Sequence, residues 1–137
     1  MELDRVAPYL GAVACLVFAA VLSAPYLIVD GLAAPIGEYY AAGPLGIAGG
    51  VFLSVLGVVI FLSGERGRAD SDLVAGIMVV VGVALFAMTT LWAVWIPDSV
   101  LFSFPQEYSW IEYHPWVSVA LSFIIATIGA VYAWAVL

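Results

Sequence analysis

The only histidine of the chain is the first place to look for metal or haem chemistry. His114 lies in a segment that also carries Asp98, Glu107 and Glu112. Hard cations take several carboxylate or carbonyl oxygens, so these four residues form a weak candidate metal site. No D-x-D-x-D-G spacing accompanies them, and a haem iron would need a second axial ligand besides His114. We therefore expect no cofactor, and we expect His114 to be an exposed or capping residue at a membrane boundary.

Other reactive residue types are scarce. The chain has no lysine, which excludes a retinal Schiff base, a Walker-type phosphate site and a lysine nucleophile. Cys15 is the only cysteine, so an intramolecular disulfide and a dithiol relay are excluded as well. No cluster of nucleophile, base and orienting group lies within an apolar run. An enzyme is thus the least favoured class.

The amino-acid composition indicates whether the chain is surrounded by water or by lipid. Of the 137 residues 66% are hydrophobic and 9% are charged, against about 45–50% and about 25% in ordinary globular chains. A soluble protein of this length could not bury so much apolar surface, so the solvent is lipid. Ten acidic residues against three arginines give a net charge of −7 and exclude a nucleic-acid partner. This acid excess without lysine is typical of proteins from salt-accumulating halophiles.

Four uncharged apolar runs organise the chain, at about 6–29, 44–62, 73–96 and 116–137. Each run is long enough to cross a bilayer as a helix, and none shows the period-two alternation of a membrane β-barrel. The sequence predicts one domain over residues 1–137, an all-α integral membrane four-helix bundle. Pro25 should kink the first helix, and Asp70 and Asp72 should cap the start of the third.

The three arginines predict the orientation of the bundle. Arg5 precedes the first run, and Arg66 and Arg68 lie in the short loop 63–71. Loops 30–43 and 97–115 carry acidic residues and no basic residue. Basic residues concentrate in the cytoplasmic loops of membrane proteins. We therefore expect a protein of the cell membrane whose two termini and loop 63–71 lie in the cytoplasm.

Small residues repeat every four positions along three of the runs. In lipid, helices associate through close van der Waals contact, which small side chains permit. We therefore expect these residues to lie at helix contacts, either within the chain or between copies of it. The expected packing residues are Gly11, Cys15 and Ala19; Gly46, Gly50 and Ser54; and Ser122, Ala126 and Ala130.

The segment 97–115 combines many aromatic rings with acidic residues. Its aromatic residues are Phe102, Phe104, Tyr108, Trp110 and Tyr113. A short interfacial helix or re-entrant turn and a docking surface for a partner or ligand are both consistent with this pattern. So much apolar surface should be ordered against the helix ends, with Phe102, Phe104 and Trp110 pointing inward. Glu107 and Glu112 should point outward, because a buried unpaired carboxylate is costly.

The layout of two short inner termini, one short inner loop and two outer loops resembles that of claudins and tetraspanins. The tryptophan motif and paired cysteines of claudins are absent from 30–43, and the cysteine-rich loop of tetraspanins is absent from 97–115. This resemblance therefore implies a topology and no residue roles. In general character the chain resembles the uncharacterised small four-span membrane proteins of haloarchaea.

Three function classes follow from these observations. The leading hypothesis is a non-enzymatic packing or interaction module, an accessory subunit of a membrane assembly. Its expected partners are membrane lipids and either further copies of itself or another membrane protein. The alternative is a binder of an apolar small molecule, such as a quinone, carotenoid or lipid, held between the helices. A transport component is the third and least favoured of these hypotheses. Ion-coupled transporters keep ionisable residues at membrane depth, and the four apolar runs have none.

Overall fold

The computed structural model describes residues 3–29, 31, 33–65 and 70–137 of the chain. Helices form its regular structure, and no strand occurs within these ranges, so the predicted all-α class is confirmed. In chain order the elements are α1 (Leu3–Ile28), α2 (Ala33–Tyr40), α3 (Ala48–Glu65), α4 (Ser71–Trp95), α5 (Asp98–Leu101), the 3-10 helix η1 (Gln106–Glu112) and α6 (His114–Val136).

Three helices are long and apolar enough to cross a membrane, over Arg5–Ile28, Asp72–Trp95 and Gln106–Val136. The fourth, α3, has 18 residues, or about 27 Å of helix at 1.5 Å per residue. It begins at Ala48 instead of the predicted residue 44. Gly43 and Gly46 take φ angles of 78° and 67°, and the Ile47 N–H donates to the Tyr40 carbonyl at 3.0 Å. This left-handed turn prevents a helix from starting earlier.

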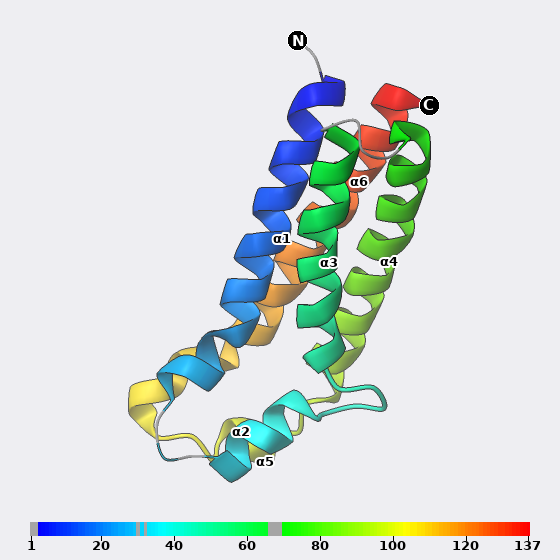
Figure 1. Cartoon of the computed structure of the whole chain (residues 1–137). Coiled ribbons are helices and arrows are strands. Elements are labelled where there is room, and N and C mark those ends of the chain that lie inside the picture. The colour runs from blue at the N-terminus through cyan, green and yellow to red at the C-terminus, as the bar shows by residue number, and fades with distance from the viewer. Residues whose placement is uncertain (1–2, 30, 32, 66–69) are drawn as a thin grey trace.

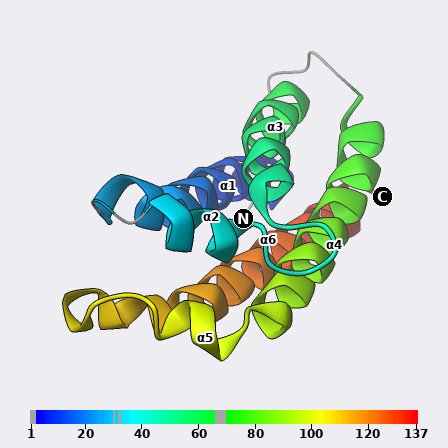
Figure 2. The same ribbon diagram turned by 90° about the horizontal axis from the view of Figure 1, so that it is seen from below.

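The four longer helices lie side by side, and each packs against two of the others (Figure 1). The contacts join α1 to α3 and α6, and they join α4 to α6 and α3. The start of α1 and the end of α6 lie at one end of these helices, and α2 and α5 lie at the other end, which Figure 2 shows from below. The segments predicted as loops 30–43 and 97–115 therefore meet at one end, and both contain helices.

Glycines allow the closest helix contacts. A Cβ atom added at Gly82 of α4 would lie 2.8 Å from the Ala126 Cα of α6. One added at Gly57 of α3 would lie 2.8 Å from the Cys15 sulfur of α1, and one at Gly11 would overlap the Phe61 ring. Helix pairs α4–α6 and α1–α3 thus approach each other at glycine, as helices in lipid commonly do.

Most of the predicted packing residues face the interior of the chain itself. Ala130 is exposed, and Gly46 belongs to the turn ahead of α3 and not to a helix face. The Ser54 and Ser122 hydroxyls donate to carbonyls of their own helices, Val51 and Val119. The buried members are Gly11, Cys15, Ala19, Gly50, Ser54 and Ser122, and Ala126 is the half-buried neighbour of Gly82.

Two further predictions concern the ends of α4 and α1. The Asp70 carboxylate accepts from the Asp72 N–H at 3.0 Å, so the predicted cap of α4 is confirmed. Pro25 lies inside α1, three residues before its end. Arg66 and Arg68, which carried most of the orientation argument, lie outside the described residues.

Candidate functional site

Pro25 leaves a gap in the hydrogen bonds of α1, and the candidate site is built around this gap. Proline has no N–H, so the carbonyl of Val21, four residues earlier, loses its helical donor. The Nε2 atom of His114, at the start of α6, lies 2.6 Å from the Val21 oxygen. A carbonyl oxygen only accepts, so Nε2 carries the hydrogen and donates it. His114 therefore satisfies the carbonyl that the proline frees.

Tyr40 of α2 engages the next pair of backbone groups along α1. Its hydroxyl donates to the Leu22 carbonyl at 2.6 Å and accepts from the Tyr26 N–H at 3.3 Å. Leu22 and Tyr26 are four residues apart, the spacing of a helical hydrogen bond. Side chains from two other helices thus support α1 on both sides of the disturbed turn, which is how helices that contain proline are tolerated in membranes.

Tyr39 connects these bonds to α4. Its hydroxyl lies 2.5 Å from His114 Nδ1. With Nε2 protonated, Nδ1 of the neutral imidazole accepts the hydroxyl hydrogen of Tyr39. The indole N–H of Trp92 donates to the Tyr39 carbonyl at 2.8 Å. These bonds join α1, α2, α4 and α6 at one point.

Aromatic rings enclose the hydrogen bonds. The Tyr39 ring meets Trp92 and Phe104 edge-on, with centroids 5.1 Å and 6.1 Å apart, and Trp110 meets His114 at 6.2 Å. Edge-to-face pairs of this kind contribute about 0.5–1.5 kcal/mol each beyond their buried area. We call this set the aromatic cluster, and its members are Tyr39, Tyr40, Trp92, Phe104, Trp110 and His114.

Burial keeps the two tyrosines of α2 protonated. Burial raises the pKa of Tyr39 far above its ordinary value, and the adjacent Tyr40 raises it further. Burial also raises the pKa of Tyr40 to about 12, although the hydrogen bond from the Tyr26 backbone lowers it in part. A tyrosine hydroxyl is already neutral at neutral pH, and the raised pKa values extend this state into the alkaline range, so both hydroxyls remain donors to His114 and Leu22 there.

His114 is not the exposed boundary residue that the sequence predicts, because only 5% of it is accessible. The free Val21 carbonyl explains this difference, since it requires a donor from another helix. Asp98, Glu107 and Glu112 are all exposed. Within the described ranges no three or more His, Cys, Asp or Glu residues lie together as a metal site would require.

The aromatic residues of 97–115 divide between the cluster and the surface. The segment forms the expected helical turns, α5 and η1, and Glu107 and Glu112 are exposed as expected. Phe104 is buried, Trp110 and Tyr108 are half-buried, and Tyr113 is exposed. Phe102 is 72% exposed, so its predicted inward direction is wrong. The short helix α5 turns Val100 inward, and a residue two positions later falls on the opposite side.

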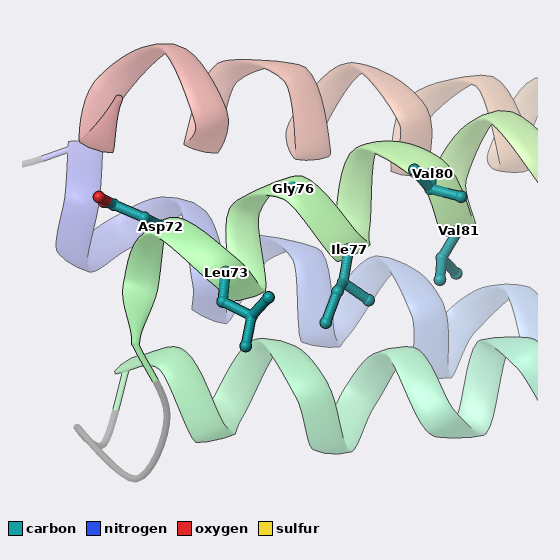
Figure 3. A pocket seen from close by; sticks show the side chains of 6 residues that line it. All are labelled: Asp72, Leu73, Gly76, Ile77, Val80 and Val81. Carbon is teal, nitrogen blue, oxygen red and sulfur yellow. The ribbon is translucent and has the colours of Figure 1, made fainter.

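Among the hollows on the described surface, two that lie outside the cluster are large enough to consider as binding sites. One is a cleft of about 540 Å³ where the ends of α2 and α4 meet α5. Its lining residues are Glu38, Ala41, Ala42, Gly43, Trp95, Pro97, Ser99 and Val100. The other is a groove of about 390 Å³ along the first turns of α4, where Leu73, Ile77 and Val81 extend from one side of the helix (Figure 3).

Sequence reasoning missed three central residues of the site, Tyr39, Tyr40 and Trp92. A signal for the site did exist, because a proline inside an apolar run implies a carbonyl that needs a donor from elsewhere. That signal calls for a donor outside α1, but it does not single out His114 among the donors of the chain. It does not identify Tyr39 and Tyr40, which lie in a segment that reads as a loop.

Over the part of the chain that the structure describes, the fold and this site define an all-helical protein with three helices long and apolar enough to span a membrane. The whole chain, residues 1–137, matches the family described as "Family of unknown function (DUF7548)", and the chain belongs to this family. No curated protein and no solved structure matches the chain.

Proposed function

We propose that the chain is an integral protein of the cell membrane in which α1, α3, α4 and α6 all cross the bilayer. The outward face of α3 supports a fourth crossing, because Phe52, Val55 and Val59 are exposed along it. Its length of about 27 Å is close to the hydrocarbon thickness of about 30 Å, and a small mismatch is accommodated at modest cost. The positions of the three arginines in the sequence support an orientation with both termini and loop 63–71 in the cytoplasm.

Within this membrane the proposed role is a non-enzymatic packing or interaction module, either in a homo-oligomer or as an accessory subunit of another membrane protein. The aromatic cluster carries this proposal. His114, Tyr39 and Trp92 bond to one another and to backbone carbonyls, so they serve the fold of the chain. The outward faces of the helices carry large apolar side chains, which are available for contact with lipid or with another membrane helix. The acid excess is consistent with a halophilic habitat, which belongs to the same proposal.

Native mass spectrometry from a mild detergent tests this role. We expect either a multiple of the 14.5 kDa chain mass or a stoichiometric complex with a second membrane protein. Phe52→Ala on α3 and Leu16→Ala on α1 form a matched pair of exposed apolar residues. Loss of the complex in one variant would identify the contacting face. A monomer without partner under all mild conditions would refute the proposed role.

A further inference from the structure

The cleft between α2, α4 and α5 combines an aromatic face with one carboxylate. The Trp95 side chain is 59% exposed, and it lines the cleft together with Glu38 and the Ser99 hydroxyl. The other lining residues are apolar or glycine, and Ala42 and Val100 are buried. The cleft therefore offers an apolar floor, an accessible indole ring and an acidic group.

Gly43 preserves this shape. Its φ angle is 78°, and a Cβ added there would lie 3.2 Å from the Trp95 Cβ. Any larger residue would be strained in this conformation and would press on the tryptophan. The glycine thus lets the chain pass close to Trp95.

The electrostatic environment of the cleft is negative. The carboxyl-terminal ends of α2 and α4 meet there, and helix carboxyl ends carry partial negative charge. Residues 31–43 and 95–112 contain no lysine or arginine. The Glu38 carboxylate and these two helix ends would repel an anionic ligand in the cleft and attract a cation.

We propose that this cleft binds an organic cation that carries an apolar body, of the alkylammonium class. The ammonium group lies against the Trp95 ring and the Glu38 carboxylate, and the alkyl chain covers Ala42 and Val100. Tryptophan is the best aromatic partner for such a cation. An inorganic cation would require several oxygen ligands and would gain nothing from the apolar floor. This inference goes beyond the proposed interaction role and is independent of which membrane side the cleft faces.

The experiment uses the full chain in lipid nanodiscs and three probes with the same alkyl length. Octyltrimethylammonium, octanol and octyl sulfate are titrated by calorimetry, and titrations of empty nanodiscs are subtracted. We expect saturable binding of one octyltrimethylammonium per chain and no saturable binding of octyl sulfate. The binding stoichiometry is counted per chain. The result can therefore be interpreted even if native mass spectrometry shows a monomer without a partner. Equal saturable binding of octanol would overturn the preference for a cation. Competition by millimolar calcium would overturn the preference for an organic cation over an inorganic one.

Matched variants locate the site. Glu38→Gln and Trp95→Leu should each weaken octyltrimethylammonium binding by about two- to fivefold, the range expected for an exposed ion pair or cation–π contact. The controls are Glu107→Gln, which removes an exposed charge at the same end, and Trp134→Leu, which removes a 79% exposed tryptophan on α6. Both controls should bind like the parent protein, and all four variants should keep its far-UV circular dichroism. If Glu107→Gln weakened octyltrimethylammonium binding as much as Glu38→Gln, the effect would be one of general surface charge and the proposed site would be refuted. The absence of saturable binding to the parent protein would refute it as well.

Discussion

Replacing His114 by phenylalanine tests whether this residue supplies the hydrogen bond that Pro25 removes from α1. His114→Phe keeps a ring in the aromatic cluster but offers no donor to the Val21 carbonyl and no acceptor to the Tyr39 hydroxyl. A buried polar group without a partner costs about 1–3 kcal/mol. Hydrogen bonds between membrane helices average about 0.6 kcal/mol and reach about 1.7 kcal/mol. For the two bonds together we expect the free energy of unfolding to fall by about 1–3 kcal/mol.

A double-mutant cycle with Pro25→Ala isolates the bond to α1. This substitution restores a backbone N–H four residues after Val21, so the helix itself can satisfy that carbonyl. In the Pro25→Ala background, His114→Phe should cost about 1 kcal/mol less than in the parent protein. Unfolding in mixed micelles of dodecyl maltoside and sodium dodecyl sulfate, followed by far-UV circular dichroism, measures both costs. Trp134→Phe should leave stability unchanged. An equal cost of His114→Phe in both backgrounds would show that His114 does not replace the hydrogen bond lost at Pro25.

Three further predictions concern packing, pH and order. Gly82→Ala should destabilise the protein by about 1–3 kcal/mol, because the new Cβ would press on the α6 backbone at Ala126. Gly76→Ala on the same helix should be neutral or stabilising by up to about 1 kcal/mol in the same assay, because open space surrounds that position. The pKa of Tyr40 rises from 10.0 to about 12 on folding, so its contribution to stability should persist below pH 10 and disappear as pH rises to about 12. Since the chain has no lysine, a pH titration of Tyr40→Phe should show a smaller alkaline loss of stability, and an unchanged loss would contradict this assignment. Amides of 106–112 should exchange with deuterium more slowly in nanodiscs than the intrinsic rates of an unstructured peptide, and exchange at those rates would contradict an ordered η1.

Much of the helical layout could be predicted because it depends on local properties of the chain. The runs at 6–29, 73–96 and 116–137 match α1, α4 and α6 closely, since a long uncharged apolar run in lipid has few alternatives to a helix. The Asp70 cap also follows from local chemistry. The start of α3 could not be predicted as easily, because Gly46 fits both a helix contact and a left-handed turn.

The site escaped prediction because its bonds are non-local. Tyr39 and His114 are 75 positions apart, and their contact depends on how α2 folds back over the ends of α1 and α6. The segment around α2 reads as a loop because it combines glycines and a proline within a few residues. Phe104 and Phe102 are equally apolar, and only the turn of α5 decides that the first is buried and the second exposed.

The most direct test of the proposed four-span topology is cysteine labelling in a Cys15→Ala background. Single cysteines at positions 41, 67 and 106 are exposed to a membrane-impermeant maleimide in whole cells, before and after permeabilisation. We expect positions 41 and 106 to react from outside and position 67 to react only after permeabilisation. Labelling of positions 41 and 67 from the same side would show that α3 does not cross the membrane. The complete reverse pattern would contradict the orientation.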